Sequence, residues 1–186
     1  MTQLWTEKRV VISADAATLA SDVADRLLVR LIRRSGAGKT SHIVLTGGAI
    51  GTEVLRAAGS HARRGDVDWS TVHFWWGDER FLPAGDSERN DASARAALLD
   101  RIDVPDENVH AMATTGDVSD LEAAAQAYAA DLARFGTEEH PWPEFYLCFL
   151  GVGPDGHIAS LFPDRPEIQV TDRSVVPVWH SPKPPE

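Results

Sequence analysis

The feature that most constrains the fold is an alternation between short apolar runs and longer segments whose apolar residues recur at helical spacing. The short runs are rich in Val, Ile, Phe and Trp, which is typical of buried strands, and the longer segments are typical of amphipathic helices. The strands that we expect cover residues 9–13, 42–46, 71–76, 108–112, 145–150 and 174–178. The helices that we expect cover residues 15–34, 52–64, 90–101 and 119–135, the last with Ser119 as its N-cap and Glu122 completing a capping box.

This alternation predicts an α/β fold with a Rossmann-like, mainly parallel sheet and helices on both faces. No internal repeat or low-complexity linker divides the 186 residues, so we expect a single domain over residues 1–186. The chain ends in the proline-rich residues 181–186, directly after an expected strand, where such a domain would continue with another helix and strand. We therefore expect the domain to lack its C-terminal part.

Charge and apolar patterning narrow the classes of partner. The net charge of −10 argues against nucleic-acid binding through a general basic surface, and an anionic small molecule would need a local pocket of Arg or Lys. No apolar run approaches the roughly eighteen residues of a membrane span, and the N-terminus lacks the apolar core of a signal peptide. The single cysteine, Cys148, lies in an apolar run and is expected to be a small buried hydrophobe. We expect a cytoplasmic protein.

Two loops that follow expected strands are suited to bind an anion. Gly47 and Gly48 would let backbone N–H groups approach an anion at a helix N-terminus, although the same residues also suit a tight turn without a ligand. Residues 77–83 bring two acids, Asp78 and Glu79, together with Arg80, which can pair bidentately with a phosphate or carboxylate. A solvated loop with a local ion pair is the alternative for this second segment, and its flanking aromatic residues favour a partly enclosed site.

The segment from residue 151 to 163 carries a candidate proton-transfer group. Three glycines and a proline predict a tight turn after the strand of residues 145–150, and the turn presents Asp155 and His157. Histidine is the side chain best suited to move protons near neutral pH, so we expect an active-site loop, with a purely structural histidine as the alternative. The other six histidines show no metal-ligand spacing, and no Gly-x-Ser-x-Gly elbow is present. We expect neither a metal nor a cofactor.

Lys183 is a second candidate cation, because the prolines of residues 181–185 stiffen its loop and lower the entropic cost of presenting it. Alone, this run is also typical of a solvated linker.

Together and in order, the segments resemble the 6-phosphogluconolactonase family, within the larger group that includes glucosamine-6-phosphate isomerase/deaminase. The most specific pieces are residues 77–80, Asn90, residues 153–163 and residues 181–185.

The resemblance implies hydrolysis of 6-phospho-D-glucono-1,5-lactone to 6-phosphogluconate in the oxidative pentose phosphate pathway. It implies that His157 is a general base that activates water and that Asp155 orients the imidazole or a sugar hydroxyl. It implies further that the substrate is contacted by Asp78, Glu79, Arg80, Asn90 and Lys183, and by backbone N–H groups at Gly47, Gly48 or Gly156. The small-molecule lactone would be the partner of a monomer or weak homodimer.

Two positions separate the branches of the group. The resemblance places Phe162 where the deaminases carry an acid that assists ring opening, and Arg80 where they carry a tyrosine, so both favour the lactonase. Ala49 and Ile50 depart from the family, which commonly has two hydroxyl residues there. A deaminase-like enzyme and a non-catalytic sugar-phosphate-binding protein stay open as alternatives.

Overall fold

A computed structural model describes residues 9–183 and confirms the α/β fold. Its centre is a parallel sheet of three strands in the order β2-β1-β3, which comprise Ser41–Leu45 (β1), Val72–Trp76 (β2) and Phe145–Cys148 (β3). The α-helices are Ala16–Ser35 (α1), Gly48–Ser60 (α2), Asn90–Ala97 (α3) and Leu121–Arg134 (α4). Short 3₁₀ turns cover Ala62–Asp66, Trp69–Thr71, Leu99–Arg101, Asp106–Asn108 and Pro166–Gln169.

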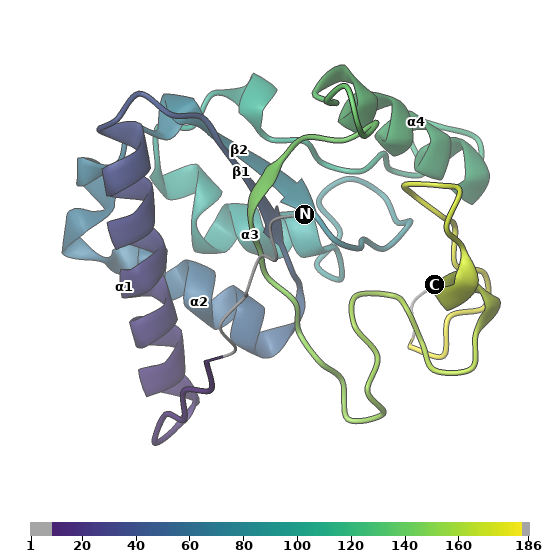
Figure 1. Cartoon of the computed structure of the whole chain (residues 1–186). Coiled ribbons are helices and arrows are strands. Elements are labelled where there is room, and N and C mark those ends of the chain that lie inside the picture. The colour runs from purple at the N-terminus through teal and green to yellow at the C-terminus, as the bar shows by residue number, and fades with distance from the viewer. Residues whose placement is uncertain (1–8, 184–186) are drawn as a thin grey trace, which may run out of the picture.

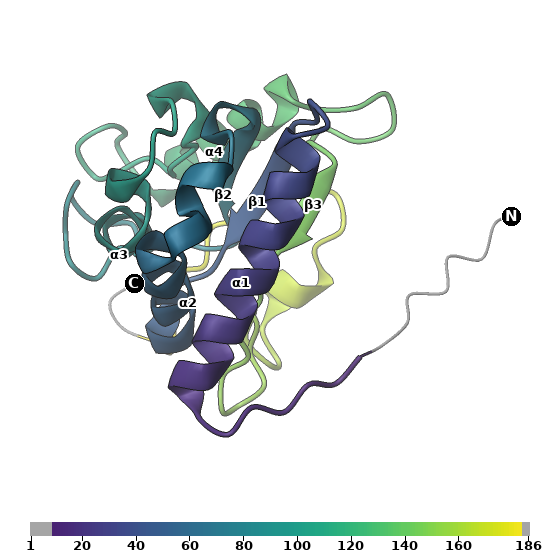
Figure 2. The same ribbon diagram turned by 90° about the vertical axis from the view of Figure 1, so that its left-hand side faces the viewer.

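The sheet is covered by helices on both faces, as expected (Figure 1). Side chains alternate between the faces of a strand, so Ile43 and Phe74 join the core beneath α1 and α2, while Val44 and Trp75 pack with Tyr128 of α4. Figure 2 shows α1 in front of β1 and α4 behind the sheet. The two layers of apolar contacts fix the sheet and leave the carboxyl ends of the strands to their loops.

Helices α1 and α4 begin at side chains that accept hydrogen bonds from the first turn. Asp15 Oδ1 accepts from the Thr18 N–H at 2.7 Å and begins α1. Helix α4 begins at Asp120, whose Oδ1 accepts from the Ala123 N–H at 2.8 Å. The expected cap at Ser119 is therefore wrong by one residue, because its hydroxyl donates to Asp120 Oδ2 instead. A carboxylate one position closer to the helix has displaced the hydroxyl as the cap.

Three expected strands do not form within the described residues 9–183. Residues 9–13 and 174–178 are irregular, and residues 108–112 contribute one isolated bridge, between Val109 and Phe74. An apolar run has a tendency to extend, but it becomes a strand only where a sheet edge is available to pair with it. Of these three segments, only 108–112 reaches a strand, and it does so at one position.

The strand β3 lies at the edge of the described sheet and pairs only with β1. Its side chains are half-buried or exposed, and Cys148 is exposed rather than buried as expected. Of the four residues of β3, only Leu147 packs against a buried apolar cluster, and its neighbours along the strand are less covered. No helix in the described part of the chain has both the length and the apolar character that a membrane span requires.

Candidate active site

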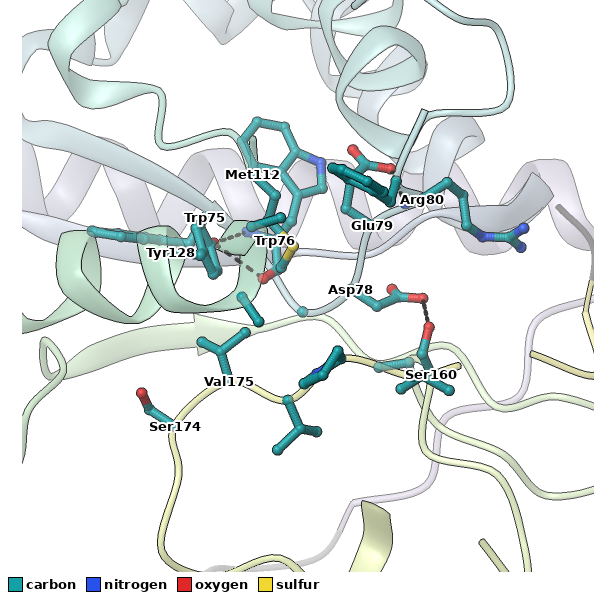
Figure 3. Close-up of a pocket in the computed structure, with 18 of the residues that line it drawn as sticks. Trp75, Trp76, Asp78, Glu79, Arg80, Met112, Tyr128, Ser160, Ser174 and Val175 are labelled. Atoms are coloured by element: carbon teal, nitrogen blue, oxygen red, sulfur yellow. Dashed lines mark hydrogen bonds between the residues drawn. The ribbon is translucent and has the colours of Figure 1, made fainter. Parts of the chain in front are cut away.

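Loops from all three strands meet at the carboxyl edge of the sheet, where ligands bind in open α/β folds. The loop after β3 contacts the loop after β2, because Ser160 Oγ donates to Asp78 Oδ2 at 2.8 Å (Figure 3). It also approaches the loop after β1, since a Cβ placed on Gly151 would lie 3.6 Å from Thr46 Oγ1. The parallel sheet has thus gathered three of the segments that the sequence singled out.

Asn90 joins the first two loops from the start of α3. Its Nδ2 donates to the Asp78 carbonyl oxygen at 2.9 Å. Its amide also lies against Gly47 so closely that a Cβ on Gly47 would be 1.8 Å from Asn90 Oδ1. Gly47 is therefore required by the approach of another side chain, and Asn90 bridges the two loops.

The N-terminus of α2 faces the same edge of the sheet. The helix begins at Gly48, which has a φ of 80°, and Gly47 provides no side-chain cap. The first N–H groups of an α-helix have no partner within the helix, and they attract anions. Ala49 and Ile50 add no hydroxyl, so any anion here would be held by backbone N–H groups.

Asp155 and His157 form a hydrogen-bonded pair within the turn that the sequence singled out. The Nδ1 of His157 lies 2.5 Å from Asp155 Oδ1, and the same oxygen accepts from the His157 backbone N–H at 3.2 Å. The hydrogen bond from the imidazole lowers the pKa of the Asp155 carboxyl below its usual value. Nδ1 is thereby engaged, and Nε2 is the ring nitrogen that remains for proton transfer.

The imidazole of His157 is held by packing as well as by Asp155. Only 14% of its side chain is exposed. The ring lies 4.9 Å from the ring of Phe162, and a Cβ placed on Gly153 would be 2.1 Å from His157 Nδ1. Gly156 adopts a φ of 88° and donates its N–H to the Gly153 carbonyl oxygen at 3.0 Å. The amide of Gly156, expected to contact substrate, is thus engaged within the turn.

Residues 78–80 point their side chains in different directions (Figure 3). Glu79 is 2% exposed and accepts three hydrogen bonds, from the backbone N–H groups of Arg80, Asn90 and Asp91, at 2.7–2.8 Å. Burial raises the pKa of its carboxyl, and those three N–H donors oppose the shift. Glu79, which the resemblance predicts to contact substrate, binds the first two N–H groups of α3 in this structure.

Two cationic residues come together from distant parts of the chain. Arg80 Nη1 donates to the Lys183 carbonyl oxygen at 3.3 Å, and Lys183 is exposed. The Lys183 segment is held by Ser181, whose hydroxyl accepts from the Lys183 N–H at 3.2 Å. Pro184 and Pro185 of the same run lie outside the described residues. The backbone of Lys183 therefore lies beside the Arg80 guanidinium at the loop after β2.

A cavity of about 370 Å³ opens beside this site, between α4 and residues 174–178. Among the expected substrate residues, Asp78, Glu79 and Arg80 reach its lining, whereas Asp155, His157 and Lys183 do not. Its floor is formed by Val44, Trp75, Tyr128 and Leu132 (Figure 3 labels Trp75 and Tyr128). An apolar floor does not suit a phosphorylated sugar, so we do not assign the substrate to this cavity.

Three residues of the site were not found from the sequence. Gly153 lies under the His157 ring, Ser160 binds Asp78, and the guanidinium of Arg89 is fully buried behind the loop of residues 77–90. Glycine in a turn and serine in a loop are too common to signal these contacts. A charged residue in a polar run predicts exposure, so nothing in the sequence indicated that Arg89 is buried.

No group of three or more His, Cys, Asp or Glu side chains in residues 9–183 is arranged to hold a metal ion.

Comparison with known families places this arrangement in context. A family model described as glucosamine-6-phosphate isomerases/6-phosphogluconolactonase matches residues 14–186. The 6-phosphogluconolactonase of Streptomyces coelicolor is 43% identical over 181 residues, which are 95% of this chain and 69% of that protein. The 6-phosphogluconolactonase of Mycobacterium leprae is 44% identical over 178 residues, which are 95% of this chain and 71% of that protein.

Solved structures give the same picture of the fold. The devB protein superposes with a TM-score of 0.70 at 35% identity, covering 78% of this chain and 60% of that one. The 6-phosphogluconolactonase of Trypanosoma brucei superposes with a TM-score of 0.69 at 28% identity, covering 91% of this chain and 69% of that one. The chain thus spans three fifths to about seven tenths of the length of these relatives.

Proposed function

The chain belongs to the family of glucosamine-6-phosphate isomerases and 6-phosphogluconolactonases, and from that membership we propose that it hydrolyses 6-phospho-D-glucono-1,5-lactone to 6-phosphogluconate. The observation that carries the proposal is the His157–Asp155 pair, in a loop whose Ser160 binds the loop that bears Arg80. A general base and a cation on contacting loops suit a substrate that has two parts: an uncharged group that reacts near the base, and an anionic group that binds the cation. A lactone that carries a phosphate has both features.

His157 is the general base in this proposal. Asp155 holds Nδ1, so Nε2 takes a proton from a water molecule as that water attacks the lactone carbonyl carbon. Asp155 also stabilises the imidazolium that forms. The ester C–O bond then breaks, and the proton held by His157 passes to the leaving ring oxygen. A lactone is an activated ester, so the step requires no covalent nucleophile.

The phosphate of the substrate and the negative charge that develops on its carbonyl oxygen are bound by different groups of the protein. We assign the phosphate to Arg80 and Lys183, whose segments are joined by a hydrogen bond. The N–H groups at the start of α2, at Gly47 and Gly48, are the donors for the carbonyl oxygen that becomes negative. Gly156 supplies the turn rather than a donor, because its N–H is already bonded. Asp78 and Asn90 border the region where the sugar hydroxyls would lie.

The setting that we propose is a single domain over residues 1–186 that acts in the cytoplasm as a monomer or weak homodimer on a small sugar-phosphate lactone. The net charge of −10 supports a discrete pair of cations, rather than a broad basic surface, as the means of binding an anion. Analytical ultracentrifugation over a range of concentrations tests the assembly state. A stable larger oligomer would contradict it.

Turnover by the wild-type chain and by His157→Gln tests the function. Freshly prepared 6-phosphogluconolactone is the substrate, and product is followed through 6-phosphogluconate dehydrogenase after subtraction of spontaneous hydrolysis. We expect acceleration by the wild type and a roughly 10²–10⁴-fold lower kcat for His157→Gln, with little change in KM, because general-base assistance is lost. His140→Gln, at an exposed histidine outside the site, is the matched control and should retain activity.

Two outcomes would favour the alternatives. Release of ammonia from glucosamine 6-phosphate would indicate the isomerase/deaminase branch, although Phe162 packs against His157 where an acid would be needed. Binding of 6-phosphogluconate without any acceleration of hydrolysis would indicate a sugar-phosphate-binding protein. Normal turnover by a folded His157→Gln variant would remove the general-base assignment.

A further inference from the structure

Arg89 is the most completely buried charged side chain among the described residues that border the site, with a relative exposure of 0%. Its Nε donates to Asp91 Oδ1 at 2.8 Å, and its Nη2 lies 3.8 Å from Glu79 Oε2. Taking a guanidinium out of water is costly, and an apolar side chain of similar size would fill the space at lower cost. The contacts that offset this cost indicate what Arg89 does.

Those contacts are with backbone carbonyl groups of two irregular segments. Nη1 donates to the carbonyl oxygens of Arg80 at 3.0 Å and Leu82 at 3.4 Å, and Nη2 donates to that of Met112 at 2.8 Å. Carbonyl groups in a loop have no ladder or helix to satisfy them. The planar guanidinium therefore joins the loop after β2 to residues 112–113, which lie between the 3₁₀ turn Asp106–Asn108 and α4.

The backbone of Arg80 is held on both sides by this buried ion cluster. Its N–H donates to Glu79 Oε1 at 2.8 Å, and its C=O accepts from Arg89 Nη1 at 3.0 Å. The second oxygen of Glu79 accepts from the N–H of Asp91, two residues after Arg89, at 2.8 Å. With both backbone groups fixed, the position from which the Arg80 side chain projects toward Lys183 is fixed as well.

We propose that Arg89 is a positioning residue that directs Arg80 toward the phosphate of the substrate. The inference rests on the proposed function, because it concerns the same anion site. Arg89 does not touch the ligand; it fixes the peptide groups from which Arg80 projects. Losing that fork would leave the carbonyl oxygens of Arg80 and Leu82 with one backbone donor each, the N–H groups of Leu82 and Thr115. The Arg80 guanidinium could then shift, and displacements of about 1 Å in such groups can cost 10²-fold.

Equilibrium binding of 6-phosphogluconate and of unphosphorylated gluconate, measured by calorimetry, tests the proposal. We expect Arg89→Met and Arg80→Met each to weaken 6-phosphogluconate binding by about 10- to 100-fold and to leave gluconate binding almost unchanged. Arg89→Lys should fall between them and the wild type, because an ammonium restores the charge but not the fork. Arg63→Met, at an exposed ion pair with Asp66, is the matched control and should bind like the wild type.

A double-mutant cycle separates positioning from general support of the fold. If Arg89 acts through Arg80, the variant with both changes binds no more weakly than Arg80→Met alone. Additive losses, equal losses for both ligands, or wild-type affinity in folded Arg89→Met and Arg89→Lys would overturn the proposal. Thermal unfolding followed by circular dichroism establishes which variants are folded. If Arg89→Met does not fold, the proposal is tested with Arg89→Lys. Wild-type protein that binds 6-phosphogluconate but does not hydrolyse the lactone would overturn the proposed function alone.

Discussion

At the scale of single residues, contacts too short to admit a methyl group set the geometry of the site. Gly153 leaves room for the imidazole of His157, and Gly47 leaves room for the amide of Asn90. In both cases the glycine is needed because another side chain occupies the position of its Cβ. The glycines of these loops thus serve the placement of functional groups as well as the turns themselves.

Gly153→Ala is predicted to impair catalysis more than stability. The new Cβ would lie 2.1 Å from both Nδ1 and Cε1 of His157, so the ring must move and its hydrogen bond to Asp155 must lengthen. We expect kcat for lactone hydrolysis to fall by about 10- to 100-fold, because a base displaced by about 1 Å no longer meets its water.

The control for this substitution is Gly65→Ala, where an added Cβ meets nothing within 4 Å. Steady-state kinetics and the midpoint of urea unfolding are measured for both variants. Unchanged kcat in Gly153→Ala would show that the observed ring position is not needed for the reaction.

At the scale of elements, β1, β2 and the segment of residues 108–112 assemble a row of three histidines on the face of the sheet that α4 covers. His42 and His73 stack with ring centroids 4.6 Å apart, and His73 Nδ1 lies 3.0 Å from His110 Nε2. His110 Nδ1 lies 2.9 Å from Asp131 Oδ2 of α4, and Arg134 also pairs with Asp131. His110 is the imidazole that contacts the Asp131 carboxylate, and protonation of all three rings would place positive charges in contact.

The folded chain is predicted to lose stability as the pH falls below about 6.5, the usual pKa of histidine. Burial lowers the pKa of His42 to about 4, with a further contribution from the charges of His73 and His110, and burial lowers the pKa of His73 and His110 as well. The unfolded chain therefore binds more protons than the folded chain between about pH 4 and 6.5, and each proton favours unfolding. The stabilisation is fully present above this range.

Urea unfolding at pH 7 and pH 5 measures this effect, and we expect a lower midpoint at pH 5. His42→Gln, whose amide oxygen can accept the hydrogen bond that Trp75 Nε1 now donates to His42 Nδ1, should reduce the difference between the two midpoints. His140→Gln, on the exposed loop after α4, is the control and should leave the difference unchanged. Equal midpoints for the wild type at both pH values would contradict the prediction.

At the scale of the whole molecule, the described chain divides into a well-packed part and a thinly packed part. The larger apolar cluster joins α1, α2 and α3 to β1 and β2. Beyond β3, residues 149–183 contain one short 3₁₀ turn and many exposed apolar side chains, among them Leu150, Val152 and Trp179. The loop that bears Asp155 and His157 therefore belongs to this thinly packed part of the molecule.

Hydrogen exchange is predicted to follow this division. Amides of β1 and β2 should exchange slowly, because they are bonded within the buried part of the sheet, whereas those of residues 150–183 should exchange through local opening at low free energy. Exchange followed by mass spectrometry of peptides from both regions measures the contrast. Addition of 6-phosphogluconate should slow exchange at residues 153–163 if that loop closes the site. Equal protection of both regions without ligand would contradict the division.

The sequence alone was enough to predict the position of each helix or strand whose pattern lies within a few consecutive residues. The helices α1 and α4 and the strands β1 and β2 lie close to their expected positions, because an apolar stripe or a buried run is recorded in a few consecutive residues. The order of loops after strands also indicated which residues would gather at the carboxyl edge, and Asp155 and His157 were visible as a pair because they are two residues apart.

The tertiary structure decided which polar side chains are bonded within the protein and which can contact a ligand. Glu79 and Arg89 look like surface charges in the sequence, yet both are buried in an ion cluster that holds α3 and the Arg80 backbone. Residues 174–178 read as a strand but have no described sheet edge to pair with. The physical reason is the same in each case: local pattern records the preference of a segment, whereas burial and pairing depend on what distant segments bring to the same place.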